Sequence, residues 1–123
     1  MAYMNDIKTR TFEAGQALAT QFIFVVQAAD GQVDPVGTVG LRADGVLLTP
    51  ATAAGQAVTV AYDGRVKVLA GGTIARGAAV TANATGRGVA AATGNIIAGY
   101  AEESAVINQV ITVRLERAGT ASA

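Results

Sequence analysis

Two small groups of carboxylates are the residues of this sequence best suited to chemistry: Glu102-Glu103, and Asp30 with Asp34. Paired carboxylates can act as a general acid and a general base, and carboxylate oxygens can also bind calcium. Neither group lies in a recognisable ligand loop, and adjacent residues of a strand point to opposite faces. We therefore interpret both groups as solvated surface carboxylates and predict no metal-binding residue.

The other side chains that usually carry out catalysis are missing. The 123 residues include no histidine and no cysteine, so the usual proton shuttle and the strongest nucleophile are absent. No phosphate-binding Gly-x-x-x-x-Gly-Lys-Ser/Thr segment occurs, and the single Gly-x-Gly, at residues 86–88, lacks the third glycine of a dinucleotide-binding loop. We therefore predict that the protein is not an enzyme and has no catalytic or cofactor-binding residues.

Charge and hydropathy exclude several kinds of partner. Nine basic and nine acidic residues balance without a basic stripe, which argues against nucleic acid because phosphate binding depends on clustered Lys and Arg. The longest apolar stretch, residues 22–26, is far shorter than a membrane span, and the N-terminal segment lacks the apolar core of a signal peptide. We expect a soluble protein, made in the cytoplasm and not exported, with neither a nucleic-acid nor a membrane partner.

Small side chains dominate the composition. Ala, Gly, Val and Thr are abundant, and only three Tyr and three Phe supply aromatic rings. Each buried methylene contributes only about 0.8 kcal/mol, so a core built of small side chains is marginal in a single domain of this length. Assembly buries additional surface and is one remedy. The composition therefore favours an oligomer.

Residues 58–68 alternate between apolar and polar on both sides of Asp63-Gly64, a pattern typical of a β-hairpin. A three-residue loop over residues 62–64 aligns the four valines of this segment on one face, whereas a two-residue loop would mix the two faces. We therefore predict a half-buried hairpin with Asp63 and Gly64 in its turn.

The same pattern, a glycine turn followed by an alternating strand, recurs along the chain. Residues 53–60 resemble residues 75–82, an offset that also aligns Gly64 with Gly86. Residues 108–113 repeat the pattern with Asn108 in the place of the glycine, and residues 14–18, with Gly15, are a fourth, partial copy. Asn is the next-best residue at a positive φ angle, so Gly55, Gly77 and Asn108 are predicted to occupy equivalent turns. Internal duplication and a Gly-Ala-Val-Thr-rich composition both explain these matches.

Short strands at spacings of about 8 to 12 residues, separated by glycine turns, indicate an all-β protein. We predict a small β-barrel or β-sandwich of short antiparallel strands. Residues 1–20 are predicted to form an extended N-terminal arm, residues 21–117 the β-domain, and residues 118–123 a flexible tail. In the first strand of the β-domain, Phe22 and Phe24 are expected to share one face, either in the core or as an exposed contact patch.

The ordered set of these elements resembles the tailed-phage capsid cement, or head decoration, proteins over roughly residues 5–117. The segments that carry the resemblance are Phe12-Glu13-Ala14-Gly15, Ala29-Asp30-Gly31, residues 54–66 from Ala-Gly-Gln to Gly-Arg-Val, residues 74–81, Ile97-Ala98-Gly99-Tyr100-Ala101 and residues 110–115. The resemblance implies a small β-rich protein that binds the outside of an expanded phage head. Such proteins commonly form trimers at three-fold positions and staple neighbouring capsid subunits.

The implied partners are therefore the major capsid protein and copies of the chain itself as a homotrimer, and the implied location is the outer surface of the virion capsid. We expect the N-terminal arm and the first strand to contribute most to capsid or subunit contact. The predicted contact residues are Ile7, Lys8, Arg10, Phe12, Phe22 and Phe24.

Two other classes of function stay open. A small β-barrel that binds a ligand or a carbohydrate needs exposed aromatic platforms, and Tyr62 and Tyr100 are the candidates. A small enzyme needs Asp, Glu, Ser or Tyr chemistry, and Glu102 and Glu103 are the first residues to substitute in a hydrolase screen.

Overall fold

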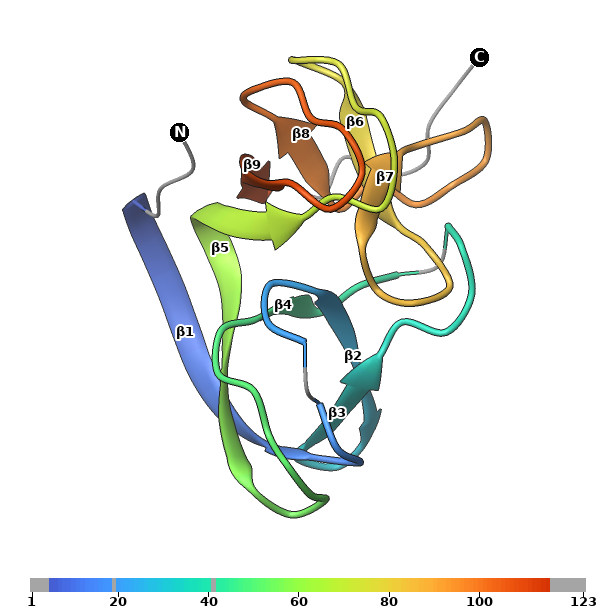
Figure 1. Ribbon diagram of the computed structural model, residues 1–123. Coiled ribbons are helices and arrows are strands. Elements are labelled where there is room, and N and C mark those ends of the chain that lie inside the picture. The colour runs from blue at the N-terminus through green and yellow to red at the C-terminus, as the bar shows by residue number, and fades with distance from the viewer. Residues whose placement is uncertain (1–4, 19, 41, 116–123) are drawn as a thin grey trace.

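The computed structural model describes residues 5–18, 20–40 and 42–115, whose regular structure is entirely β (Figure 1). The predicted all-β class is confirmed. The nine strands are β1 (Asn5–Ala14), β2 (Phe24–Ala29), β3 (Gln32–Pro35), β4 (Gly45–Leu47), β5 (Ala57–Leu69), β6 (Ala79–Ala82), β7 (Gly88–Ala90), β8 (Gly99–Ala101) and β9 (Val110–Leu115). They form one mixed sheet in the order β1-β3-β2-β4-β5-β9-β8-β6-β7, in which β1 and β3 are parallel.

The long strand β5 is shared by two halves of the molecule. In the first half, β1, β3, β2, β4 and β5 pair in a closed circuit, because β1 also pairs with β5. In the second half, the sheet continues from β5 through β9, β8 and β6 to β7, and a parallel bridge between Ala70 and Gly88 brings β7 back beside the end of β5. The architecture is therefore two small wound halves joined by β5, and not one clean barrel or a two-sheet sandwich (Figure 1).

Each half has its own hydrophobic core, and the strands between the halves contribute to both. Consecutive residues of these strands alternate between the two cores: Val46 faces one and Leu47 the other, as do Ala61 and Val60. A strand buried on both faces has a continuous apolar sequence instead of an alternating one. This explains why the chain reads as uninterrupted apolar residues around positions 22–26 and 46–48.

The hairpin predicted for residues 58–68 does not exist, because the chain continues through Asp63-Gly64 as the single strand β5. The register of β1 against β5 shifts on both sides of the Lys8–Asp63 pair, and Gly64 has a φ of 96°. Asp-Gly therefore forms an irregularity of the bulge type, which needs the same positive φ as a turn. The irregularity reverses the alternation, so that Ala61 and Val66 lie in the same core.

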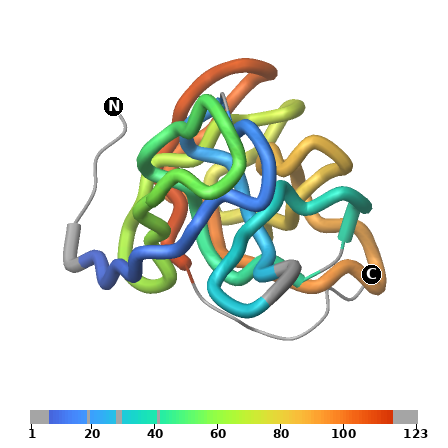
Figure 2. Tube along the Cα trace, turned by 90° about the horizontal axis from the view of Figure 1, so that it is seen from below, coloured from blue at the N-terminus to red at the C-terminus, as the bar shows by residue number. Residues whose placement is uncertain are grey.

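The N-terminal segment, predicted as an arm, forms strand β1 of the sheet over residues 5–14. β1 pairs antiparallel with β5 from Asn5↔Arg65 to Glu13↔Ala57, and its last residues also pair with β3. It runs along one side of the molecule (Figure 2). Pairing with β5, which is distant in the sequence, orders this segment. The segment therefore does not need the hydrophobic period of an element that packs by itself. The tail predicted at residues 118–123 lies outside the described residues.

Phe22 and Phe24 do not share a face. Phe24 begins β2 and is fully buried in the core of the second half, whereas Phe22 lies before the strand with a φ of 62° and is half-buried. The N–H of Phe22 donates to the carbonyl of Leu47, and its own carbonyl accepts from Leu69, at 2.8 Å each. These two hydrogen bonds, made to different strands, hold Phe22 out of the extended conformation that the sequence pattern predicts.

The recurrent turn predicted from the sequence is confirmed at three of its four positions as one loop geometry, whereas Gly15 of the partial copy has no positive φ. Gly55, Gly77 and Asn108 have φ values of 88°, 86° and 70°. In each loop this residue donates its N–H to an alanine carbonyl, and the alanine N–H donates back to the carbonyl of the next loop residue. The positive-φ residues and their alanines are Gly55 with Ala14, Gly77 with Ala101 and Asn108 with Ala70, at N···O distances of 2.8, 2.7 and 2.8 Å.

Two of these loops are hydrogen-bonded to each other. Residues 70–78 and residues 101–109 are joined by a reciprocal bridge in which Ile74 and Ala105 exchange backbone hydrogen bonds of 2.9 Å. Residues 70–78 immediately precede β6, and residues 101–109 immediately precede β9. The two segments therefore occupy the same place before a strand and make the same contacts with each other. We call residues 74–79 and 105–110 the sister loops.

Candidate functional site

The predicted contact residues of β1 lie on an accessible edge of the molecule. Lys8 and Arg10 are exposed, while Ile7 and Phe12 are half-buried, each packed against one of the two cores. The guanidinium carbon of Arg10 lies 5.5 Å from the centroid of the Phe12 ring, a cation–π distance. β1 therefore presents a cation and an aromatic ring side by side, fixed by backbone pairing to β5.

The two predicted contact residues that follow β1 lie elsewhere. Phe24 is fully buried, so it cannot contact another protein without unfolding, and its predicted contact role is incorrect. Phe22 is half-buried, with the ammonium of Lys67 5.9 Å from the centroid of its ring. The structure thus separates Phe22 from the β1 residues.

A surface hollow of about 530 Å³ lies beside β1 and is lined by Arg10, Phe12, Gln27, Asp44 and Tyr62. Its acidic wall is fixed: Asp44 Oδ2 accepts the backbone N–H of Gln27 at 2.7 Å, and Asp44 Oδ1 lies 3.3 Å from Nε of Arg42. Tyr62 is 41% exposed. The hollow therefore combines one cation, one carboxylate and two aromatic rings.

Tyr62 and Asp44 also line a second, adjoining hollow of about 320 Å³, which reaches Ala98 and Leu115 of the other half. Next to Tyr62, the ammonium of Lys8 lies 3.9 Å from Oδ2 of Asp63, and both side chains are more than half exposed. Exposed ion pairs of this kind contribute about 0–1 kcal/mol. We call the surface formed by Lys8, Arg10, Phe12 and Tyr62 the β1 surface.

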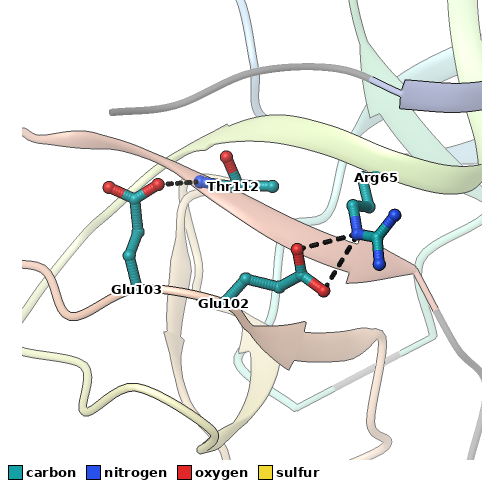
Figure 3. A network of polar contacts seen from close by, with 4 residues as sticks. All are labelled: Arg65, Glu102, Glu103 and Thr112. Carbon is teal, nitrogen blue, oxygen red and sulfur yellow. Dashed lines mark hydrogen bonds and ion pairs between the residues drawn. The ribbon is translucent and has the colours of Figure 1, made fainter.

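The paired glutamates form a separate polar network (Figure 3). Nε of Arg65 lies 2.9 and 3.1 Å from the two carboxylate oxygens of Glu102, which joins β5 to the segment after β8. Glu103 accepts the backbone N–H of Thr112 at 3.3 Å. Although burial by itself raises the pKa of Glu103, this backbone hydrogen bond and other favourable contacts outweigh it, and the pKa lies below the ordinary 4.5.

This network fixes the structure, and its carboxylates are already engaged. Both glutamates line a hollow of about 500 Å³ with Tyr100, whose ring centroid lies 5.8 Å from the guanidinium carbon of Arg114. Tyr62 and Tyr100, the two aromatic platforms considered for a ligand, line different hollows. Within residues 5–18, 20–40 and 42–115 no group of three acidic side chains is arranged to hold a metal ion. No helix in this part of the chain could cross a membrane.

Sequence reasoning found Arg10 and Phe12 but not the residues that complete the hollow beside them. Gln27 and Asp44 belong to β2 and to the segment before β4, and they meet β1 only through the closed circuit of strands. Tyr62 is expected from the sequence to be an aromatic platform for a ligand and not part of a surface with β1. No local pattern marks these three residues, since their proximity depends on strand pairing distant in the sequence.

Comparison with known proteins gives a structural relationship. No protein-family model matches this sequence, and no curated protein matches it. Among solved structures, the chain is similar to the head fiber gp8.5 N base of bacteriophage phi29, with a TM-score of 0.64 and 21% sequence identity. The similarity covers 95% of this chain and 99% of the phage chain. At this identity the finding establishes that the two chains share a fold over nearly all of their compared lengths.

Proposed function

We propose that this protein is a structural component of a bacteriophage virion: a decoration protein that binds the outer surface of the head and stabilises contacts between major capsid subunits. The observation that carries the proposal is the fold shared over 95% of the chain with a phage head fiber base. The sequence resemblance to capsid cement proteins supports the same role independently of that fold comparison.

The β1 surface is the part of the molecule best suited to bind a shell. Rigid aromatic rings and an arginine provide contact area and directed hydrogen bonds at little cost in conformational entropy, and such residues are enriched at protein interfaces. Phe12 is held against its core and Arg10 stacks on it, so both are preorganised. The exposed cations Lys8 and Arg10 fit an acidic rim on the partner.

Multiple copies offset weak individual contacts in this role. A decoration protein that assembles as a homotrimer engages several capsid subunits at once, and the second and third contacts form at a high effective concentration. The small-residue composition, which leaves a single domain marginal, suits a protein that gains stability by assembly.

Co-sedimentation with phage heads stripped of their decoration protein tests the proposal. We expect saturable sedimentation of the wild type and at least about tenfold weaker binding of the Arg10→Glu variant, a loss of roughly 1.4 kcal/mol. Arg76→Glu is the matched control, since it makes the same charge change at an exposed arginine of another hollow. Binding that is absent in the wild type contradicts the proposed function, and equal binding by both variants contradicts the assignment of the β1 surface.

A further inference from the structure

One of the sister loops carries an unusual concentration of exposed apolar side chains. Val106, Ile107 and Val110 are 54%, 59% and 38% exposed. They are three of the five large apolar residues that the described part of the chain leaves exposed, the other two being Val39 and Tyr62. We call Val106, Ile107 and Val110 the apolar tip.

The fold itself does not require these apolar side chains, because the same loop is built elsewhere without them. In the other sister loop, the N–H of Ala78 donates to Ala75, just as that of Gln109 donates to Val106, at 3.0 and 3.2 Å. In that loop, Ala75 and Arg76 stand at the positions of Val106 and Ile107, and Arg76 is exposed, whereas Ala75 is exposed as well. The third loop of this geometry has Ala53 and Ala54 there, also exposed. Backbone geometry therefore accepts small or charged residues at these positions and does not require the large β-branched pair.

The surroundings of the apolar tip suit contact with an identical surface. Residues 104–113 contain no charged side chain, and the whole chain has a formal net charge of +0. Around a rotation axis each residue meets its own copy or a close neighbour of it, so any charge there would face a like charge. The nearby cation of Arg87 is engaged, since its Nη1 donates to Oδ1 of Asn108 at 2.7 Å within the same chain.

We propose that the apolar tip is a contact between copies of this chain, in which tips of neighbouring copies pack against one another around a rotation axis. The inference deepens the proposed function by naming the surface through which copies meet. Three partly exposed side chains supply far less than the roughly 800 Å² per partner of a standard interface. The contact by itself is therefore weak, and association depends on protein concentration.

The first test is light scattering by the purified chain from about 1 µM to about 1 mM, a range that covers weak association. We expect the mean mass of the wild type to rise with concentration and the dissociation constant of Val106→Thr/Ile107→Thr to be at least about tenfold higher. Threonine keeps the β-branched shape at exposed positions, so the fold is retained. Ala75→Thr/Arg76→Thr, at the equivalent positions of the other sister loop, is the matched control and should behave as wild type.

The second test distinguishes tip-to-tip packing from insertion of the tip into a different surface. Ile107→Glu and Ile107→Lys should each be monomeric when alone, because like charges then meet at the axis. An equimolar mixture of the two should associate more strongly than either variant alone, since attractive pairs then outnumber repulsive ones around a two-fold or a three-fold axis.

A wild type that stays monomeric throughout, an oligomer that persists in the threonine variant, or a mixture that fails to associate overturns the inference. None of these outcomes depends on phage heads. Sedimentation of the Arg10→Glu variant with heads therefore tests the proposed function separately.

Discussion

Replacing Gly77 by alanine tests whether the repeated loop depends on a positive φ. Gly77 has a φ of 86°, and a Cβ built there meets no atom within 4 Å, so the only cost is backbone strain. A left-handed residue with a Cβ costs about 1–2 kcal/mol, partly offset by the lower entropy of the unfolded chain. We expect Gly77→Ala to lower the free energy of unfolding by about 1 kcal/mol, and Gly77→Asn by about half of that.

The assay is urea unfolding followed by circular dichroism, at one protein concentration low enough to avoid association. In a parallel thermal unfolding experiment, a loss of 1 kcal/mol corresponds to a fall in Tm of roughly 3–6 °C for a domain of this size. Gly37→Ala is the matched control, because Gly37 has no positive φ and a Cβ there also meets nothing within 4 Å. That control should be neutral or up to about 1 kcal/mol more stable.

The reciprocal change completes the test. Asn108 occupies the equivalent position at a φ of 70°, so Asn108→Gly should change stability by less than about 0.5 kcal/mol, relief of strain balancing the lost contact with Arg87. The reasoning is refuted if Gly77→Ala is no more destabilising than Gly37→Ala, or if asparagine at position 77 costs more than alanine.

Four further substitutions probe the core, the strand contacts and the polar network. Phe24→Ala should lower the free energy of unfolding by about 3–5 kcal/mol because the ring is fully buried, whereas Phe22→Ala should lower it much less. Equal losses of stability in thermal unfolding would contradict the different burial of the two rings. Gly99→Ala should lower the free energy of unfolding more than Gly77→Ala does, although the φ of Gly99 is ordinary, because a Cβ there collides with the carbonyl oxygen of Arg114 on β9. Unchanged stability would show that β8 and β9 lie further apart than in the structure. Glu103→Gln should lower stability near neutral pH, and its difference from wild type should shrink as the pH falls below about 4.5. A pKa lowered by folding stabilises the protein only where the carboxylate is ionised, and a difference independent of pH would exclude this effect.

Several positions that need a positive φ were readable from the sequence, but their structural role was not always readable. Gly55, Gly77 and Asn108 were assigned to equivalent turns, and they are equivalent down to the hydrogen bonds they make. Asp63-Gly64 has the same local preference, yet it lies inside a continuous strand. A bulge and a hairpin turn require the same backbone conformation, and only the partner strands decide between them.

The sequence identifies only part of the candidate site, because the remaining residues join it through strand pairing. Arg10 and Phe12 stand out as a cation and a ring in a segment without its own period, but Asp44 and Gln27 join them only when the circuit of strands closes. Phe24 was misassigned because residues 22–26 are apolar at every position. A stretch of this kind carries no periodic signal to show which side is exposed, and here Ile23 and Phe24 face different cores.

The sequence by itself determined the all-β class and the left-handed turns at Gly55, Gly77 and Asn108, because these depend on local backbone preferences and short-range alternation. Only the tertiary structure decided that two cores share β5, that β1 is a paired strand, and that the exposed Val106 and Ile107 lie in a loop whose sister loop carries Ala75 and Arg76. These features result from strand pairing between distant segments. Such pairing depends on which complete set of contacts buries the most apolar surface, and no single segment encodes it.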